Sequence, residues 1–297
     1  MKAFVTGAGG FVGPYLVGHL SDCGDDIVET DSELDVTDAE GVRKALLASR
    51  PDAVYHLAAA SHVGTSWSAP VDVLRVNAEG TLNVLLAAIE AEVGRVLVVG
   101  SAEEYGRVSP DALPIAETVL LRPVSPYGAS KAAAEMLASH AFHGRGLSVT
   151  CVRAFNHLGP GQSEALVASS IAKQIADAER AGGGMVQTGD LSPRRDFTDV
   201  RDVVRAYRLL VERGEGGETY NVCSGRDVAI QEVADLLAAS STVPLTFELD
   251  ESRLRPVDVP VVRGDNTKLR AATGWEPEIP LRQTLADILT WWRQHLA

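Results

Sequence analysis

Two residues of the segment Tyr127-Gly-Ala-Ser-Lys131 have the types and spacing needed for proton transfer. At positions i and i+4 of a helix start, their Cβ atoms lie on one face within ~6 Å of each other. A phenol with a pKa of about 10 is a poor acid–base catalyst at neutral pH, and an adjacent ammonium favours its phenolate. The chain has only five lysines, so a lysine four residues after a tyrosine is less expected by chance than in a lysine-rich sequence. The pair therefore predicts an acid–base role for Tyr127 with Lys131 as its partner.

A hydroxyl that could join this pair is Ser101, in the segment Ser101-Ala-Glu-Glu-Tyr-Gly106. The segment follows residues 95–100, an apolar run typical of a buried strand. Ser101 then falls at the carboxyl edge of the sheet, where open α/β sheets bind ligands. We expect its hydroxyl to hydrogen-bond the oxygen that Tyr127 protonates or deprotonates, although a turn-capping role is also open.

The strongest motif is Thr6-Gly-Ala-Gly-Gly-Phe-Val-Gly13, with glycines at i, i+3 and i+6 between an expected strand and an expected helix. Such glycines allow a tight turn, a close backbone approach to a pyrophosphate and close packing of the helix on the strand. Backbone N–H groups at the helix N-terminus supply partial positive charge for the phosphates. The motif predicts a dinucleotide-binding site.

Asp31 follows the second expected strand, 18 residues after Gly13. A carboxylate at this place can hydrogen-bond both ribose hydroxyls of an adenosine and would repel a 2′-phosphate. Other acids surround Asp31, and no Arg or Lys occurs between it and Arg43. We therefore predict that NAD(H) is favoured, with NADP(H) possible; a solvated strand end is the alternative interpretation of Asp31.

The elements that must position these residues alternate between short apolar strands and helices, which predicts an α/β fold with a parallel sheet covered on both faces. Strands are expected at 3–6, 26–30, 53–57, 95–100 and 148–154, and helices at 13–23, 42–49, 77–92, 130–142, 165–180, 203–213, 230–240 and 281–295. We predict a Rossmann-like, doubly wound domain over 1–158, which also receives part of 186–225. Residues 159–297 are expected to form mainly a smaller α/β substrate-binding domain.

Composition narrows the function classes. The 297 residues are 45% hydrophobic and carry a formal net charge of −13, which disfavours nucleic acid and anionic membrane surfaces as partners. The three cysteines have no CxxC spacing, which favours a reducing, cytoplasmic setting, and no metal site is indicated. The apolar runs are too short to cross a bilayer, and the first strand leaves no room for a signal peptide.

With these motifs in place, the chain resembles the extended short-chain dehydrogenase/reductase (NAD-dependent epimerase/dehydratase) family that works on nucleotide-sugars. The resemblance rests on the glycine loop, Asn77, Ser101 and Tyr127 with Lys131, and covers essentially the whole chain. Longer motifs at 153–162, 194–202, 220–225 and 254–260 are similar to those of GDP-4-keto-6-deoxy-D-mannose reductases.

The resemblance implies roles on the cofactor side. Residues implied to contact the pyrophosphate are Gly7, Gly10, Phe11 and Val12, with Asp31 at the adenosine ribose. Those implied to flank the adenine or line the groove are Asp35, Val36, Leu57, Ala58, Ala59 and Asn77. Lys131 is implied to hold the nicotinamide ribose and to tune Tyr127.

On the substrate side, the resemblance implies that Asn156, Arg195 and Arg255 hold the diphosphate of a GDP-linked sugar. Guanidinium forks suit a dianionic diphosphate that approaches an acidic protein. Val167 and Ser170 match a helix that contacts the base. Helices 77–92 and 130–142 are Ala- and Leu-rich, and family members commonly pair such helices into a homodimer.

The implied reaction is hydride transfer to C4 of a 4-keto sugar, with a proton from Tyr127 and Ser101 at the developing alkoxide. The product would be a GDP-6-deoxyhexose such as GDP-D-rhamnose. Glu103 stands where related 4,6-dehydratases place a base, so a GDP-mannose 4,6-dehydratase remains an alternative, as does a nucleotide-sugar 4-epimerase. A nucleotide-binding regulator on the same fold is the non-enzymatic alternative.

Overall fold

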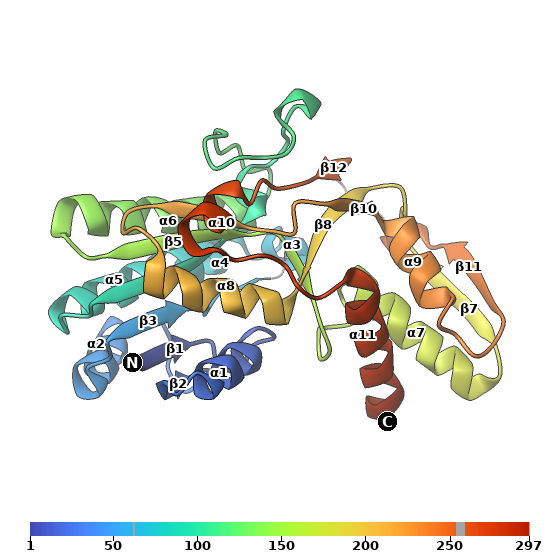
Figure 1. Ribbon diagram of the computed structural model, residues 1–297, viewed down its shortest axis with the longest axis horizontal. Coiled ribbons are helices and arrows are strands. Elements are labelled where there is room, and N and C mark those ends of the chain that lie inside the picture. Colours follow the sequence, from blue (N-terminus) through green and yellow to red (C-terminus); the bar gives the residue numbers. More distant parts are fainter. Residues whose placement is uncertain (62, 254–258, 297) are drawn as a thin grey trace.

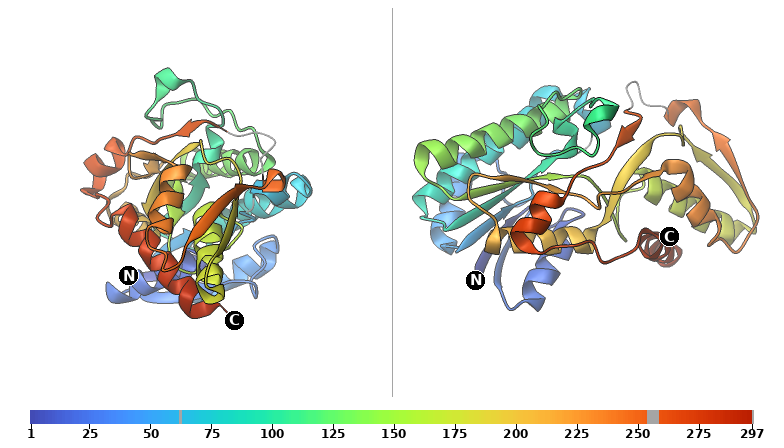
Figure 2. Two further views of the ribbon diagram at one scale, coloured as in Figure 1. Left: turned by 90° about the vertical axis from the view of Figure 1, so that its right-hand side faces the viewer. Right: turned by 45° about the horizontal axis from the view of Figure 1, so that its top comes forward.

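The computed structural model describes residues 1–61, 63–253 and 259–296. Two lobes make up the molecule: a large one built on a parallel sheet and a small one at the opposite end, where the C-terminal helix lies (Figure 1). The chain passes between the lobes several times, so both halves of the sequence contribute to the large lobe (Figure 2).

The large lobe contains a six-stranded parallel sheet in the order β2-β1-β3-β4-β5-β9. Its strands are β1 (Lys2–Thr6), β2 (Asp26–Thr30), β3 (Ala53–His56), β4 (Arg95–Ser101), β5 (Val149–Ala154) and β9 (Thr219–Val222). The strand order reverses between β1 and β3, and such a switch point is where open α/β sheets form their ligand crevice. The predicted doubly wound, Rossmann-like fold is confirmed.

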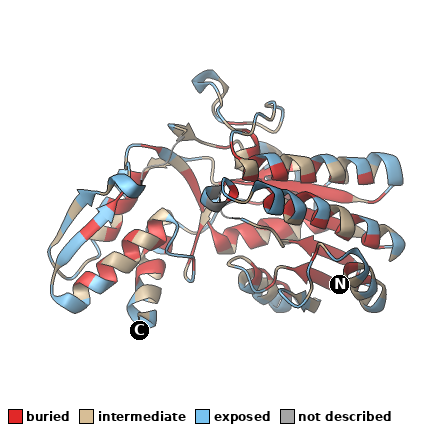
Figure 3. Ribbon diagram, turned by 180° about the vertical axis from the view of Figure 1, so that it is seen from behind, coloured by how far each residue is buried: buried red, intermediate tan, exposed pale blue. Residues whose placement is uncertain are grey.

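Helices cover both faces of this sheet, as its uninterrupted apolar strands require (Figure 3). On one face, the core includes Leu16 and Leu20 of α1 (Gly13–Asp22) and Val203 of α8 (Val200–Arg213). On the other, α2 (Ala39–Ser49), α5 (Gly80–Glu90) and α6 (Pro126–Arg145) contribute side chains such as Leu46, Leu85 and Ala138. Short elements complete the lobe: α3 (Val63–Ser66), α4 (Pro70–Leu74), η1 (Arg75–Glu79), η2 (Ala102–Glu104), η3 (Pro110–Ala112) and α10 (Thr267–Thr273).

The small lobe has its own core, formed by α7 (Val167–Ala181), α9 (Ile230–Ala238) and α11 (Leu281–His295) around residues such as Ile175, Val233 and Ile288. Its strands are β6 (Asn156–Leu158), β7 (Gly184–Thr188), β8 (Arg194–Asp199), β10 (Asp227–Ala229), β11 (Leu245–Leu249) and β12 (Val261–Val262), with η4 (Glu251–Arg253) after β11. Strand β8 pairs with β6, β10 and β12, and β7 pairs with β11.

Several expected helices start elsewhere than the sequence suggested, and two of them lie beside the predicted catalytic residues. The helix expected at 77–92 begins with a π-helical turn, Arg75–Glu79, before regular α5 starts at Gly80. The helix expected at 130–142 starts four residues earlier, because the Ser125 hydroxyl accepts the Gly128 N–H and Pro126 occupies the first helical position. Tyr127 and Lys131 therefore both lie inside α6. No helix among the described residues is long and apolar enough to span a bilayer.

Candidate active site

The glycine motif forms the turn between β1 and α1 at the switch point of the sheet. Gly7 has a φ of 70°, and a Cβ on it would lie 2.7 Å from the Ala58 amide nitrogen. A Cβ on Gly13 would lie 2.1 Å from the carbonyl oxygen of Ala8. Both positions thus require glycine. The first turn of α1 has no side-chain cap and no acidic residue, so its amides are left for an anion.

Asp31 directly follows β2 and lies beside this turn. A Cβ on Gly9 would come within 2.4 Å of Asp31 Oδ2, so the carboxylate sits over the glycine loop. Asp35 is exposed; its carboxylate accepts the Thr37 N–H and hydroxyl, and these hydrogen bonds hold its pKa below the usual range. Val36 is buried and packs on Gly80 of α5. The structure thus brings Asp31 to the loop, whereas Val36 belongs to the core.

The backbone at Leu57–Ala59 continues β3 along the glycine loop, where Ala58 N donates to Thr6 Oγ1 at 3.3 Å. Asn77 lies in the π-helical turn and is 1% exposed. Its Oδ1 accepts from Ala60 N at 2.8 Å, and its Nδ2 donates to Ala60 O and to Ser130 Oγ. Asn77 thus ties the chain after β3 to α6, the helix that carries Tyr127.

Ser101 and Tyr127 meet at the carboxyl end of β4. Tyr127 lies beside Ser101, which acts to lower the pKa of its phenol, and both residues are 9% exposed. Ser101 Oγ also accepts from Glu103 N at 3.2 Å, so the hydroxyl caps η2 as well. Gly128 permits this approach, since a Cβ there would lie 2.5 Å from the Glu103 carbonyl oxygen. The geometry suits a proton donor and a hydroxyl acting on one oxygen.

The expected electrostatic effect of Lys131 on Tyr127 is not what the structure shows. Lys131 Nζ donates to Val99 O at 2.7 Å, and burial lowers its pKa to about 8. Burial instead raises the pKa of Tyr127 above its usual 10, with Ser101 opposing the rise. Desolvation is thus the largest effect on Tyr127, which stays a protonated phenol at neutral pH. That state is the one a proton donor needs.

The predicted diphosphate residues lie on the small-lobe side. Asn156 on β6 is exposed and pairs in register with Phe197 of β8, the strand that also carries Arg195. Arg195 Nη1 donates to Val259 O at 2.7 Å. Arg255 lies outside the described residues.

Val167 and Ser170 are half-buried in the first turns of α7. Ser170 Oγ accepts from Arg253 Nη1 at 3.1 Å. Sequence reasoning did not select Arg253, although its place directly before the substrate-like motif at 254–260 was a usable signal. Its guanidinium is a further cation beside the predicted base-contacting turn.

A buried chain of hydrogen bonds behind the glycine loop was also missed. Thr6 Oγ1 lies 2.8 Å from His56 Nδ1, His56 Nε2 lies 3.0 Å from Thr81 Oγ1, and Thr81 donates to Asn77 O. Because the Thr81 hydroxyl donates its hydrogen to the Asn77 carbonyl oxygen, it can only accept from His56. The imidazole must therefore donate through Nε2 and accept from Thr6 at Nδ1. Burial lowers the pKa of His56 to about 3, which keeps this neutral tautomer.

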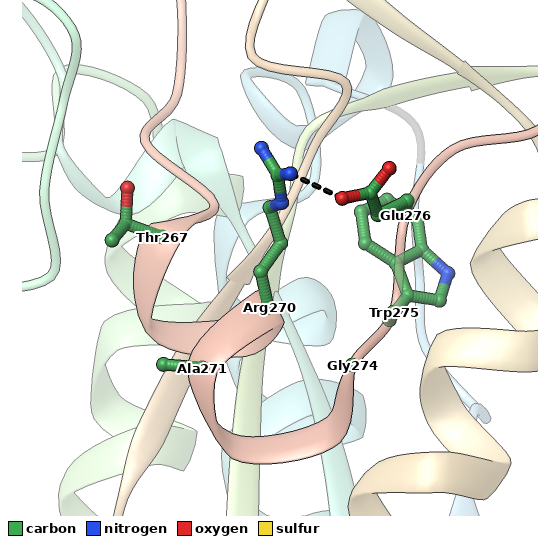
Figure 4. A pocket seen from close by; sticks show the side chains of 6 residues that line it. All are labelled: Thr267, Arg270, Ala271, Gly274, Trp275 and Glu276. Atoms are coloured by element: carbon green, nitrogen blue, oxygen red, sulfur yellow. Dashed lines mark hydrogen bonds and ion pairs between the residues drawn. The ribbon is translucent and has the colours of Figure 1, made fainter.

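A depression of about 360 Å³ lies at the end of α10, lined by Thr267, Arg270, Ala271, Gly274, Trp275 and Glu276 (Figure 4). It holds none of the predicted site residues, and its Arg270 guanidinium is ion-paired with Glu276. Among the described residues, no group of three or more His, Cys, Asp or Glu side chains could hold a metal ion.

The sheet, its glycine turn and the residues at its carboxyl edge define an extended short-chain dehydrogenase/reductase, a class of NAD(P)-dependent enzymes. Residues 29–288 match the sequence profile of a family described as GDP-mannose 4,6 dehydratase, and the chain belongs to this family.

Individual relatives cover almost the whole chain. The chain is 38% identical to a GDP-6-deoxy-D-mannose reductase of Pseudomonas aeruginosa, over 99% of its own length and 98% of that protein. A structure of RMD from Pseudomonas aeruginosa complexed with NADPH superimposes with a TM-score of 0.92, at 37% identity over 99% of each chain. A UDP-glucose 4-epimerase of Mycolicibacterium smegmatis is 30% identical over 99% of each chain.

Proposed function

We propose that the protein reduces the C4 keto group of GDP-4-keto-6-deoxy-D-mannose with NAD(P)H, giving a GDP-6-deoxyhexose such as GDP-D-rhamnose. The observation that carries the proposal is the pairing of Ser101 with Tyr127, two buried hydroxyls at the carboxyl end of β4, close enough that Ser101 lowers the pKa of the phenol. Full-length similarity to a GDP-6-deoxy-D-mannose reductase supports the choice of substrate.

The residues around the switch point suit a dinucleotide. The uncapped N-terminus of α1 and the glycine turn leave room and amides for a pyrophosphate, contacted by Gly7, Gly10, Phe11 and Val12. Lys131 would hold the nicotinamide ribose. When bound, the reduced nicotinamide supplies the hydride.

The chain's own residues supply the proton and the oxygen-binding groups. Tyr127 donates its phenolic proton to the C4 oxygen as that oxygen becomes an alkoxide, and the Ser101 hydroxyl donates a hydrogen bond to the same oxygen. Both side chains are almost fully buried, where such hydrogen bonds are stronger than in water.

For the nucleotide-sugar, we assign Asn156, Arg195 and Arg255 to the diphosphate, and Val167 and Ser170 to the base, which we propose is guanine. Asp31 is assigned to the adenosine ribose, so NADH is expected to be the better cofactor, with NADPH still accepted. Because the similar RMD structure holds NADPH, the ratio of kcat/KM for NADH over NADPH is the measurement that tests this preference.

Glu103 favours one second candidate, a GDP-mannose 4,6-dehydratase, because it stands two residues after Ser101, where related 4,6-dehydratases place a base, and its charge acts on Tyr127. A nucleotide-sugar 4-epimerase shares the same centre. Both activities regenerate their NAD within each turnover, whereas a reductase consumes NADH. A purely regulatory role is disfavoured, since Ser101, Tyr127 and Lys131 are all present.

The decisive experiment offers the purified protein GDP-mannose alone, and then GDP-4-keto-6-deoxymannose with NADH. A reductase converts only the second, with one NADH oxidised per product, and the product is identified by mass and NMR. Dehydration of GDP-mannose, or NAD that stays bound through purification, would instead support the dehydratase or epimerase.

We further propose a homodimer formed through α5 and α6, on which Leu86 and Met136 are exposed apolar side chains. A cytoplasmic setting stays a prediction; it agrees with three cysteines that form no disulfide.

A further inference from the structure

Three ionisable side chains are buried together beside the Ser101–Tyr127 pair. Glu104 of η2 has no exposed surface, while Glu135 of α6 and Arg153 of β5 are each 6% exposed. Glu104 touches the site directly, because its Oε1 accepts from Ser101 N at 2.7 Å. With Ser101 Oγ accepting from the following turn, this is a reciprocal capping box.

The Arg153 guanidinium is committed to partners other than Glu104. Its Nε and Nη2 donate to the Glu135 carboxylate at 2.9 and 2.5 Å, and its Nη1 donates to Tyr105 Oη and to Glu117 O. Glu104 Oε2 lies 3.8 Å from Arg153 Nε, beyond hydrogen-bond reach, and accepts no hydrogen bond from any described residue.

Two carboxyl groups therefore share one guanidinium away from water. An ionised Glu104 would leave a buried negative charge without a donor on Oε2, next to the negative charge of Glu135, which is costly. A neutral acid removes the conflict: its carbonyl oxygen still accepts from Ser101 N, and its O–H has the Glu135 carboxyl as an acceptor. Burial and the Glu135 charge raise the pKa of Glu104 to about 8.

Two further features connect this carboxyl group to the site. Gly100 precedes Ser101 in β4, and a Cβ there would lie 2.4 Å from Glu104 Oε1. Tyr127, Lys131 and Glu135 follow one another at intervals of four in α6, so the helix face with the predicted catalytic pair also presents Glu135. The same helix face thus holds both the predicted proton donor and the anchor of the buried cluster.

We propose that Glu104 is a positioning residue of the reductase: as a neutral acid bridging Ser101 N and Glu135, it fixes the turn that holds the Ser101 hydroxyl at Tyr127. The effect on catalysis rests on the proposed function, whereas the protonation of Glu104 does not.

The activity test compares two substitutions of one side chain. Glu104→Gln keeps an acceptor for Ser101 N and a donor for Glu135, so we expect kcat close to that of wild type. Glu104→Leu removes both, and we expect kcat to fall on the order of 10- to 100-fold while KM changes little, as for a misplaced catalytic group.

Asp202→Asn is the matched control, because Asp202 is an equally buried carboxylate that accepts from Glu278 N and Ile279 N, away from Ser101. It should lower stability without lowering kcat per folded molecule. Equal kcat losses in Glu104→Leu and Asp202→Asn, or a large loss in Glu104→Gln, would overturn the positioning role.

The protonation test needs no substrate. Infrared difference spectra of the wild type against Glu104→Gln, at pH 6.5, should contain the carbonyl band of a protonated carboxylic acid. If that band is missing, the neutral acid is refuted even when the enzyme is active. If wild type fails to reduce the 4-keto sugar while the band is present, the proposed function fails and the buried acid stands.

Discussion

At the scale of single residues, the chemistry of this protein depends on how deeply its ionisable groups are buried. Tyr127, Lys131, Glu104 and His56 are all less than a tenth exposed, and burial shifts the pKa of each toward its neutral form. At neutral pH, Tyr127, Glu104 and His56 are therefore neutral donors, while Lys131, with a pKa of about 8, is mostly an ammonium. Such donors suit a reaction that places negative charge on a sugar oxygen.

Tyr127→Phe removes the proposed proton donor and leaves the ring packed in place. We expect kcat to fall by roughly 10²- to 10⁴-fold, the usual contribution of a positioned acid. Binding of NADH, followed by fluorescence titration, should change little, and retention of more than a tenth of the activity would exclude Tyr127 as the donor.

Asp31→Ala tests whether the Asp31 carboxylate binds the adenosine ribose hydroxyls. Loss of a charged hydrogen bond of about 1.5–3 kcal/mol should shift the ratio of kcat/KM for NADH over NADPH toward NADPH by roughly 10- to 100-fold. Glu29→Ala is the control, since it removes an equal charge from an exposed position on β2. Equal shifts in both variants would mean that the loss of one negative charge, and not of a ribose contact, changed the cofactor preference.

Glu104→Gln should also change how stability depends on pH. The pKa of Glu104 is raised from 4.5 to about 8 on folding, so its contribution to stability is fully present below about pH 4.5 and is lost as pH rises through 8. The amide does not titrate, so Glu104→Gln should gain stability over wild type between pH 5 and 8 and then level off. Urea unfolding at several pH values measures this, and a constant difference would contradict the shift.

At the scale of elements, α1 offers a matched pair of glycines. Gly13→Ala forces a methyl group against the Ala8 carbonyl and should lower the free energy of unfolding by about 1–3 kcal/mol. Gly18→Ala, where a Cβ meets nothing within 4 Å inside the same helix, should raise it by about 0.5–1 kcal/mol. Destabilisation by both substitutions, in urea titration, would show that α1 rather than the turn is at fault.

The sheet strands of the first half could be predicted from the sequence because they are short apolar runs between helices of clear periodicity. The expected range 26–30 is strand β2, and 281–295 is helix α11. The strands of the small lobe were not located, since β8 carries mostly polar residues and β10 has only three residues, and β8 becomes a strand by pairing with β6, β10 and β12.

The candidate site was predictable only where a motif reports backbone geometry. Gly7, Gly13 and Asp31 meet because the glycine turn requires it, whereas the raised pKa of Tyr127 could not be read from a spacing that suggested the opposite. Glu104 carried a sequence signal, the Ser-x-x-Glu pattern of a capping box. The burial of its carboxyl group could not be predicted, because it depends on Gly100 and Arg153, and Arg153 comes near Glu104 only once the sheet has formed.

At the scale of the whole molecule, the dimer is a prediction that follows from exposed apolar side chains on α5 and α6. Multi-angle light scattering should give twice the mass of one 31.5 kDa chain at micromolar concentration. Met136→Glu, a charge on an exposed position of α6, should shift the equilibrium to monomers with the fold intact. A monomeric wild type would end this proposal.

The place of β9 in the large sheet has a consequence for synthesis of the chain. Until residue 222 has left the ribosome, β5 is an open edge with unpaired backbone groups, although all other strands of that sheet are already made. The sheet of the newly made chain therefore stays incomplete, with β5 exposed at its edge, until β9 is made after much of the small lobe. While it is unpaired, that exposed strand edge is a site at which newly made chains can aggregate.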